Sequence, residues 1–134
     1  MFNSIKAISL GIIILLSLEL INQLILIMSA VGFNFLIKSY PSLIPWSQIF
    51  TYSMGAFGHF IVMSLTGMTV AITSVSNRAC LNAGIAATIG SSISLYLSLR
   101  DDIFTPIAFI FLISGIIFAL IACSLWLKHA AKKS

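Results

Sequence analysis

Long apolar stretches separated by very few charged residues constrain this 134-residue chain more than any other feature of its sequence. A helix needs about 20 apolar residues to cross the hydrocarbon core of a bilayer, and four such stretches take up nearly all of the chain. Apolar residues make up 60% of the sequence and charged residues 7%, whereas soluble domains carry about 25% charged residues. The sequence therefore predicts an all-α integral membrane protein whose residues 1–134 form a single domain, a four-helix transmembrane bundle.

The spans are predicted at about residues 7–30, 49–73, 79–99 and 103–127. The longest connection contains Pro41 and Pro45, which remove backbone donors and interrupt helices, together with Tyr40 and Trp46, which are typical of headgroup depth. The pattern leaves two alternatives for residues 33–37, which either continue the first helix or lie along the membrane interface.

The basic residues predict the orientation of the bundle. With four spans, both termini and the connection near residue 78 share one side of the membrane. Five basic residues fall on that side and two on the other, and the side richer in lysine and arginine is cytoplasmic by the positive-inside rule. We therefore expect both termini in the cytoplasm and a location in the plasma membrane, the inner membrane of a bacterium. The five are Lys6, Arg78, Lys128, Lys132 and Lys133, against Lys38 and Arg100.

A polar stripe crosses the first predicted span. Glu19, Asn22 and Gln23 are spaced so that they share one helical face, and an ionisable group at this depth needs a partner inside the bundle. His59 in the second span falls at a similar height, since both helices rise about 1.5 Å per residue. If the first two helices are antiparallel neighbours, Glu19 and His59 can share a proton or a charged hydrogen bond.

This intramembrane polar site has two interpretations. It is a site that couples a transported ligand to protons, or it is a buried polar pair that fixes how two helices pack. Ionisable groups inside membranes are often functional, but no third ionisable residue lies in the predicted membrane core to extend a proton relay.

Small residues recur on the last two predicted spans. Gly84, Thr88 and Ser92 lie four residues apart, and Gly115 and Ala119 repeat the pattern. Small side chains at this spacing let membrane helices approach closely. The sequence predicts a helix-packing face here, either internal to the bundle or used against another chain.

The charged triplet Arg100, Asp101 and Asp102 is predicted to lie on the extracytoplasmic side. It is a solvated loop in which Asp102 caps the last helix, with Pro106 in that helix's opening turns. Alternatively, it is an ion-attracting mouth or a docking point for a periplasmic partner.

The two cysteines give no metal-ligand spacing. Cys80 and Cys123 are expected near the cytoplasmic ends of their helices, where they can be close in space. A reducing cytosol argues against a structural disulfide between them.

Three functional hypotheses follow, and none is catalytic, since no catalytic motif is present. The leading one is a non-catalytic subunit that packs against other membrane helices, in a hetero-complex or a homo-oligomer. The alternative is a small homodimeric transporter that uses Glu19 and His59 to couple its substrate to protons. The basic residues are not interleaved with aromatics in a stripe, so nucleic-acid binding is not indicated.

The third hypothesis is a haem- or quinone-binding membrane anchor of a respiratory complex, although no cofactor is predicted for the chain alone. His59 can serve as one axial haem ligand. His129 lies beyond the predicted end of the last span, so a second ligand within the membrane would have to come from another chain.

Overall fold

The computed structural model describes residues 2–98 and 106–133, without the side chains of residues 2, 76 and 98. Over these residues the elements are α1 (Phe2–Ser39), the 3-10 helix η1 (Pro41–Trp46), α2 (Ser47–Thr73), the 3-10 turn η2 (Ser76–Arg78), α3 (Ala79–Ser98) and α4 (Pro106–Lys133). Four helical segments, one from each of α1 to α4, are long and apolar enough to cross a membrane. Over the described residues the predicted all-α class is confirmed, with four helices that are long and apolar enough to span a membrane.

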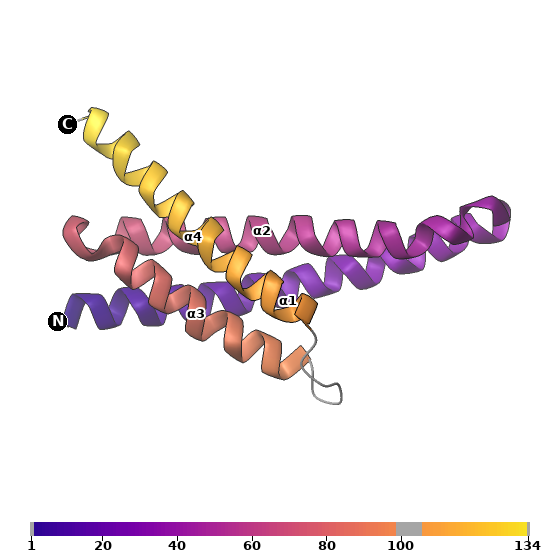
Figure 1. Cartoon of the computed structure of the whole chain (residues 1–134), viewed down its shortest axis with the longest axis horizontal. Helices are drawn as coiled ribbons and strands as arrows, with labels where there is room; N and C mark the ends of the chain where they lie inside the picture. Colours follow the sequence, from indigo (N-terminus) through magenta and orange to yellow (C-terminus); the bar gives the residue numbers. More distant parts are fainter. Residues whose placement is uncertain (1, 99–105, 134) are drawn as a thin grey trace.

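The four helices form two antiparallel hairpins (Figure 1). α1 and α2 run side by side, and the shorter pair of α3 and α4 crosses them obliquely over one half of their length. Both chain ends and the α2–α3 turn lie at the same end of the molecule, while the α1–α2 turn lies at the opposite end. An even number of spans is what places both termini on one side of the membrane. That the end with both termini faces the cytoplasm remains a prediction.

α1 extends further than the span predicted at residues 7–30, because residues 33–37 continue the helix. No proline interrupts the sequence between Phe2 and Tyr40, so nothing stops the helix where the hydrocarbon core would end. Pro41 then disfavours a helical conformation at the preceding residue. Tyr40 accordingly adopts φ −133° and ψ 81°, and α1 ends at Ser39.

α4 continues beyond its predicted end at residue 127, to Lys133. Its described part begins at Pro106, where the fixed φ of proline suits a first turn, and the predicted start at residue 103 lies outside the described residues. Lys132 and Lys133 lie in the last turn, where positive charge interacts favourably with the helix dipole. Residues 100–102, including the predicted cap, lie outside the described residues.

α2 and α4 approach closely at Gly67. A Cβ atom at this position would overlap the backbone of Ala119. Ala119 is itself fully buried, and Gly115 is buried one turn earlier on α4. The small residues predicted on the last span therefore pack inside the bundle, where close backbone approach replaces the hydrophobic driving force that is missing between helices in lipid.

α3 turns a different face inward. Ala83, Ala86 and Ala87 are fully buried, whereas Thr88 and Ser92 are exposed and Gly84 is only partly covered. The predicted face of Gly84, Thr88 and Ser92 therefore lies on the outside of the described bundle, and the adjacent alanine ridge forms the internal contact. Both ridges carry small residues, so the sequence pattern did not separate them.

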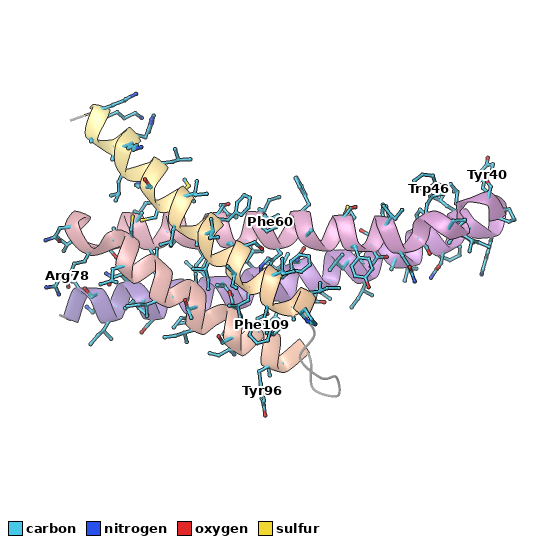
Figure 2. All side chains as sticks on the ribbon, viewed as in Figure 1. Tyr40, Trp46, Phe60, Arg78, Tyr96 and Phe109 are labelled. Atoms are coloured by element: carbon cyan, nitrogen blue, oxygen red, sulfur yellow. The ribbon has the colours of Figure 1, made fainter. Side chains whose placement is uncertain are left out.

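The outer surface is apolar, as a lipid-facing surface should be. Large exposed hydrophobic side chains occur along all four helices. The hydroxyl of Thr88 donates to the carbonyl of Gly84 at 2.7 Å, and the hydroxyl of Ser17 donates to that of Ile13 at 2.8 Å. Such internal hydrogen bonds satisfy polar groups that lipid cannot solvate. Tyr40 and Trp46 lie together near the α1–α2 turn (Figure 2).

Cys80 on α3 and Cys123 on α4 are adjacent, with their Sγ atoms 3.0 Å apart. Both are free thiols, and Cys123 is fully buried. The expected proximity of the two cysteines is present.

Candidate functional site

Glu19 and His59 meet inside the bundle. Nδ1 of His59 lies 2.8 Å from Oε1 of Glu19, and the side chains of His59 and Glu19 are only 18% and 10% exposed. α1 supplies the carboxyl group and α2 the imidazole, so the antiparallel pairing of these helices brings together two residues 40 positions apart. The contact expected from their equal depth is present.

The other ring nitrogen of His59 faces α4. Nε2 lies 3.3 Å from the backbone carbonyl oxygen of Phe111, and the ring of Phe111 meets the imidazole edge to face with 5.9 Å between centroids. Gly115 makes room for this contact, because a Cβ there would lie 2.6 Å from Nε2. His59 therefore connects α1, α2 and α4.

These two contacts restrict where protons can reside on the pair. The carbonyl of Phe111 only accepts hydrogen bonds, so Nε2 must carry a hydrogen and donate it. The short contact between Nδ1 and Oε1 then holds one further proton, bound either to the imidazole or to the carboxyl group. In both forms the pair has no net charge, which is the arrangement that burial favours. The two contacts therefore fit a pair that shares one proton between Nδ1 and Oε1.

The pair lines a cavity of about 240 Å³ to which all four helices contribute. Its polar lining consists of Glu19, Asn22, Gln23, His59, Ser91 and Ser94, and its apolar lining comes mainly from α3 and α4. An apolar cavity of about 150 Å³ takes up benzene, so this one has room for a small organic molecule. It combines apolar walls with a few convergent polar groups, as ligand sites commonly do.

Asn22 and Gln23 extend the polar wall of the cavity. Asn22 is buried, 8% exposed, and its amide occupies the space beside Gly58, where a Cβ would overlap it. Gln23 is more exposed than Asn22. All three residues of the predicted stripe on α1 therefore line the cavity beside His59.

Three groups at the cavity were not among the predicted site residues. Ser91 is buried and donates a hydrogen bond to Sδ of Met63 at 3.7 Å, and Ser94 follows one turn later on α3. Their spacing of three residues marks one helical face, which is the only sequence signal for them. The third group, the carbonyl of Phe111, is backbone and has no signal in the sequence.

His59 is unsuited to axial haem ligation in this arrangement. Both of its ring nitrogens already have hydrogen-bonding partners within the chain. His129 is exposed near the end of α4, far along the helix from the contact with Phe111. A bis-histidine site would require His59 to give up one partner.

A second, separate hollow lies on the outside of α3. It is an apolar groove of about 590 Å³ bordered by Leu120 of α4 and by Cys80, Leu81, Gly84, Ile85, Thr88 and Ile89 of α3. A Cβ at Gly84 would meet only Leu120, at 3.4 Å. The exposed small-residue face of α3 thus contributes to this groove and not to the polar cavity.

No protein-family model, curated protein or solved structure matches this chain. The functional interpretation therefore depends on the geometry of the site.

Proposed function

We propose that this chain is a small proton-coupled membrane carrier in which the Glu19–His59 pair exchanges its proton for a bound ligand. The observation that carries the proposal is the placement of His59, with Nε2 facing a carbonyl and Nδ1 facing a carboxyl group. The pair lines a cavity large enough for a small organic molecule. Four helices are few to enclose a pathway, so we infer that two copies act together.

Charge balance supplies the coupling. The protonated pair is neutral, so a cationic ligand beside Glu19 would leave the site with a net positive charge inside the membrane. Loss of the shared proton restores neutrality, because the ligand then balances the carboxylate. An isolated buried charge costs several kcal/mol, and ligand binding and proton loss should therefore be linked one to one.

Proton flux in proteoliposomes tests this proposal. The purified chain is reconstituted with an internal pH dye, and choline, hexyltrimethylammonium, glycine and succinate are added in turn. We expect at least one cation to raise the internal pH at a rate above that of protein-free vesicles. Glu19→Gln and His59→Gln should abolish this coupling, while His129→Gln, a matched histidine change outside the cavity, should retain it. Absence of solute-coupled proton movement, or full coupling in Glu19→Gln, would contradict the proposal.

The subunit hypothesis has support from a different observation. The groove on α3 presents small residues to the outside, and Thr88 and Ser92 turn their hydroxyl groups back onto their own helix at 2.7 Å. The resulting surface is apolar, which suits close packing of a transmembrane helix. We propose a helix of another membrane chain as its occupant under this hypothesis.

Leucine substitutions in the groove test the subunit role. Gly84→Leu combined with Thr88→Leu should fill the groove and disperse a complex extracted in mild detergent. Ser17→Leu changes an exposed hydroxyl on α1 to the same side chain and serves as the control. If native mass measurement finds the same particle for all three proteins, the groove does not hold a partner helix.

The orientation and location expected from the basic residues belong to the same proposal. The end of the bundle that carries both termini carries Lys6, Arg78 and the lysines of α4. We infer that this end faces the cytoplasm of a bacterial cell, with the α1–α2 turn outside the inner membrane.

A further inference from the structure

A crevice on the outside of the bundle leads toward the polar pair. It lies between α1 and α3 and has a volume of about 240 Å³. Leu20 and Leu97 border it and are 68% and 65% exposed, so in a membrane they contact lipid. The remaining lining residues are Leu16, Glu19, Gln23 and Ser94.

The crevice and the cavity meet at a common polar wall. Glu19, Gln23 and Ser94 line both of them. Beyond this wall the cavity contains the pair and the amide of Asn22, whereas the crevice is bordered by leucines. The lining is thus mostly apolar in the crevice and more polar in the adjoining cavity.

A ligand that matches this change in lining has an apolar part and a polar head. The ionisable side chains beside the two spaces indicate the charge of that head. Within the described chain, the only ionisable groups that line either space are Glu19 from α1 and His59 from α2. α3 contributes Ser91, Ser94 and leucines, and α4 contributes Ala108, Phe111 and Leu112. An anionic head would meet the carboxyl group with no lysine or arginine beside it. A basic head would meet a proton donor and then a carboxylate.

We propose that an amphiphilic amine enters from the bilayer through the α1–α3 crevice and binds with its nitrogen at Glu19 and its apolar part among Leu16, Leu20 and Leu97. The proposal rests on the proposed function, since the same pair gives up its proton, here to the nitrogen of a neutral amine and not to water. A neutral amine suits entry from lipid, where a charged group is costly. It deepens the carrier hypothesis by assigning the ligand's chemical class and its route.

The proton transfer balances within the site. The proton shared by Nδ1 and Oε1 leaves that contact, and an N–H bond forms on the amine nitrogen. The products are a neutral imidazole, a carboxylate and an ammonium group, so the net charge is zero before and after. The ammonium then forms an ion pair with Glu19 in the position that the proton held.

Binding measurements in lipid nanodiscs test the proposal with matched probes. N,N-dimethylhexylamine carries both head and tail, trimethylamine the head alone, and 1-hexanol a tail with an uncharged head. We expect the first to bind at least tenfold more tightly than either of the others, after subtraction of partitioning into empty nanodiscs. The ¹⁵N resonance of Nδ1 in His59 should move toward that of an unprotonated ring nitrogen. Equal affinities for dimethylhexylamine and trimethylamine would overturn the entry route from lipid.

Substitution of the crevice border provides the second readout. Leu20→Trp should narrow the crevice and weaken dimethylhexylamine binding at least tenfold, whereas Ile13→Trp, at a similarly exposed position on α1, should leave it unchanged. Equal binding in both variants would overturn the proposal. Choline-driven proton flux can persist in Leu20→Trp while dimethylhexylamine binds no more tightly than trimethylamine. In that case the carrier function stands and the lipid route fails. Tight, Leu20-dependent amine binding without proton-coupled flux would refute the carrier function and leave the binding site in place.

Discussion

At the scale of single residues, His59 links its own helix to two others, which its position in the sequence does not indicate. Its ring contacts a carboxyl group on α1 and a backbone carbonyl on α4 while it belongs to α2. A buried polar group stabilises a membrane bundle only when its hydrogen bonds are made. The Glu19–His59 pair should therefore contribute to stability as well as to proton exchange, and the two roles are separable by experiment.

A double-mutant cycle measures the stability role. Glu19→Gln and His59→Gln should each lower the free energy of unfolding by about 1–3 kcal/mol, because each weakens or removes the hydrogen bond that its buried partner now makes. The double variant should lose less than the sum, with a coupling energy of about 1–2 kcal/mol. Unfolding titrations in mixed micelles provide the measurement, and His129→Gln provides the reference for a histidine exposed at the helix end. Strict additivity would show that the pair does not interact in the membrane.

At the scale of helices, close backbone approach determines how α2 and α4 pack. Gly67 faces the backbone of Ala119 with no space for a methyl group, and Ala119 is fully buried. Interiors packed this closely respond to a single added carbon. Glycine positions away from such contacts should not respond in this way.

Gly67→Ala and Gly32→Ala form a matched pair that tests this packing. Gly67→Ala should destabilise the bundle by about 1–3 kcal/mol, since the backbone of α4 must move to accept the methyl group. Gly32 has no atom within 4 Å of a Cβ built on it, and alanine there should be neutral or stabilise α1 by up to about 1 kcal/mol. Thermal denaturation in detergent compares the two. Similar losses in both variants would contradict the packing of α2 on α4.

The cysteines test how α3 packs on α4. Because the Sγ atoms of Cys80 and Cys123 are 3.0 Å apart, oxidation by oxygen with a copper catalyst should join them within one chain. The two thiols lose two hydrogen atoms and two sulfurs become bonded, so intact mass and loss of maleimide labelling both report the reaction. Cys80→Ser should remove the intrachain product. Products that are only interchain would place the two helices apart.

At the scale of the whole molecule, the chain is two hairpins of unequal length crossing each other (Figure 1). The longer hairpin reaches well beyond the shorter one, and Tyr40 and Trp46 lie at its far end (Figure 2). These aromatics are amphipathic and favour the membrane–water interface. The opposite end holds the termini and most of the basic residues, so the two ends of the bundle differ in charge and should face different compartments.

Cysteine labelling tests this orientation. In a background with Cys80→Ser and Cys123→Ser, Tyr40→Cys should react with a membrane-impermeant maleimide in intact spheroplasts. Lys132→Cys should react only after permeabilisation, because the positive-inside rule predicts that the lysine-rich end faces the cytoplasm. Equal labelling of both sites in intact cells would indicate mixed orientations. Labelling of Lys132→Cys alone would indicate the reverse topology.

Properties that add up locally along the chain could be predicted from the sequence. The cost of placing each residue in lipid sums over a stretch, so apolar content identified four membrane helices. The fixed rise of a helix placed Glu19 and His59 at one height. Bilayer thickness alone left two alternatives for residues 33–37, and the structure shows that they continue α1. The helix ends where Pro41 restricts the residue before it.

Only the tertiary structure decided which helix faces meet. On α3 the ridge of Gly84 and Thr88 and the ridge of Ala83 and Ala87 are both built from small residues, and only contact with neighbouring helices buries one of them. The carbonyl of Phe111 became a partner of His59 because α4 lies against α2 there, and every residue offers such a carbonyl. Transfer into lipid depends on one residue at a time, whereas packing depends on the shapes of two surfaces. The composition of one helix does not determine which surface of another it meets.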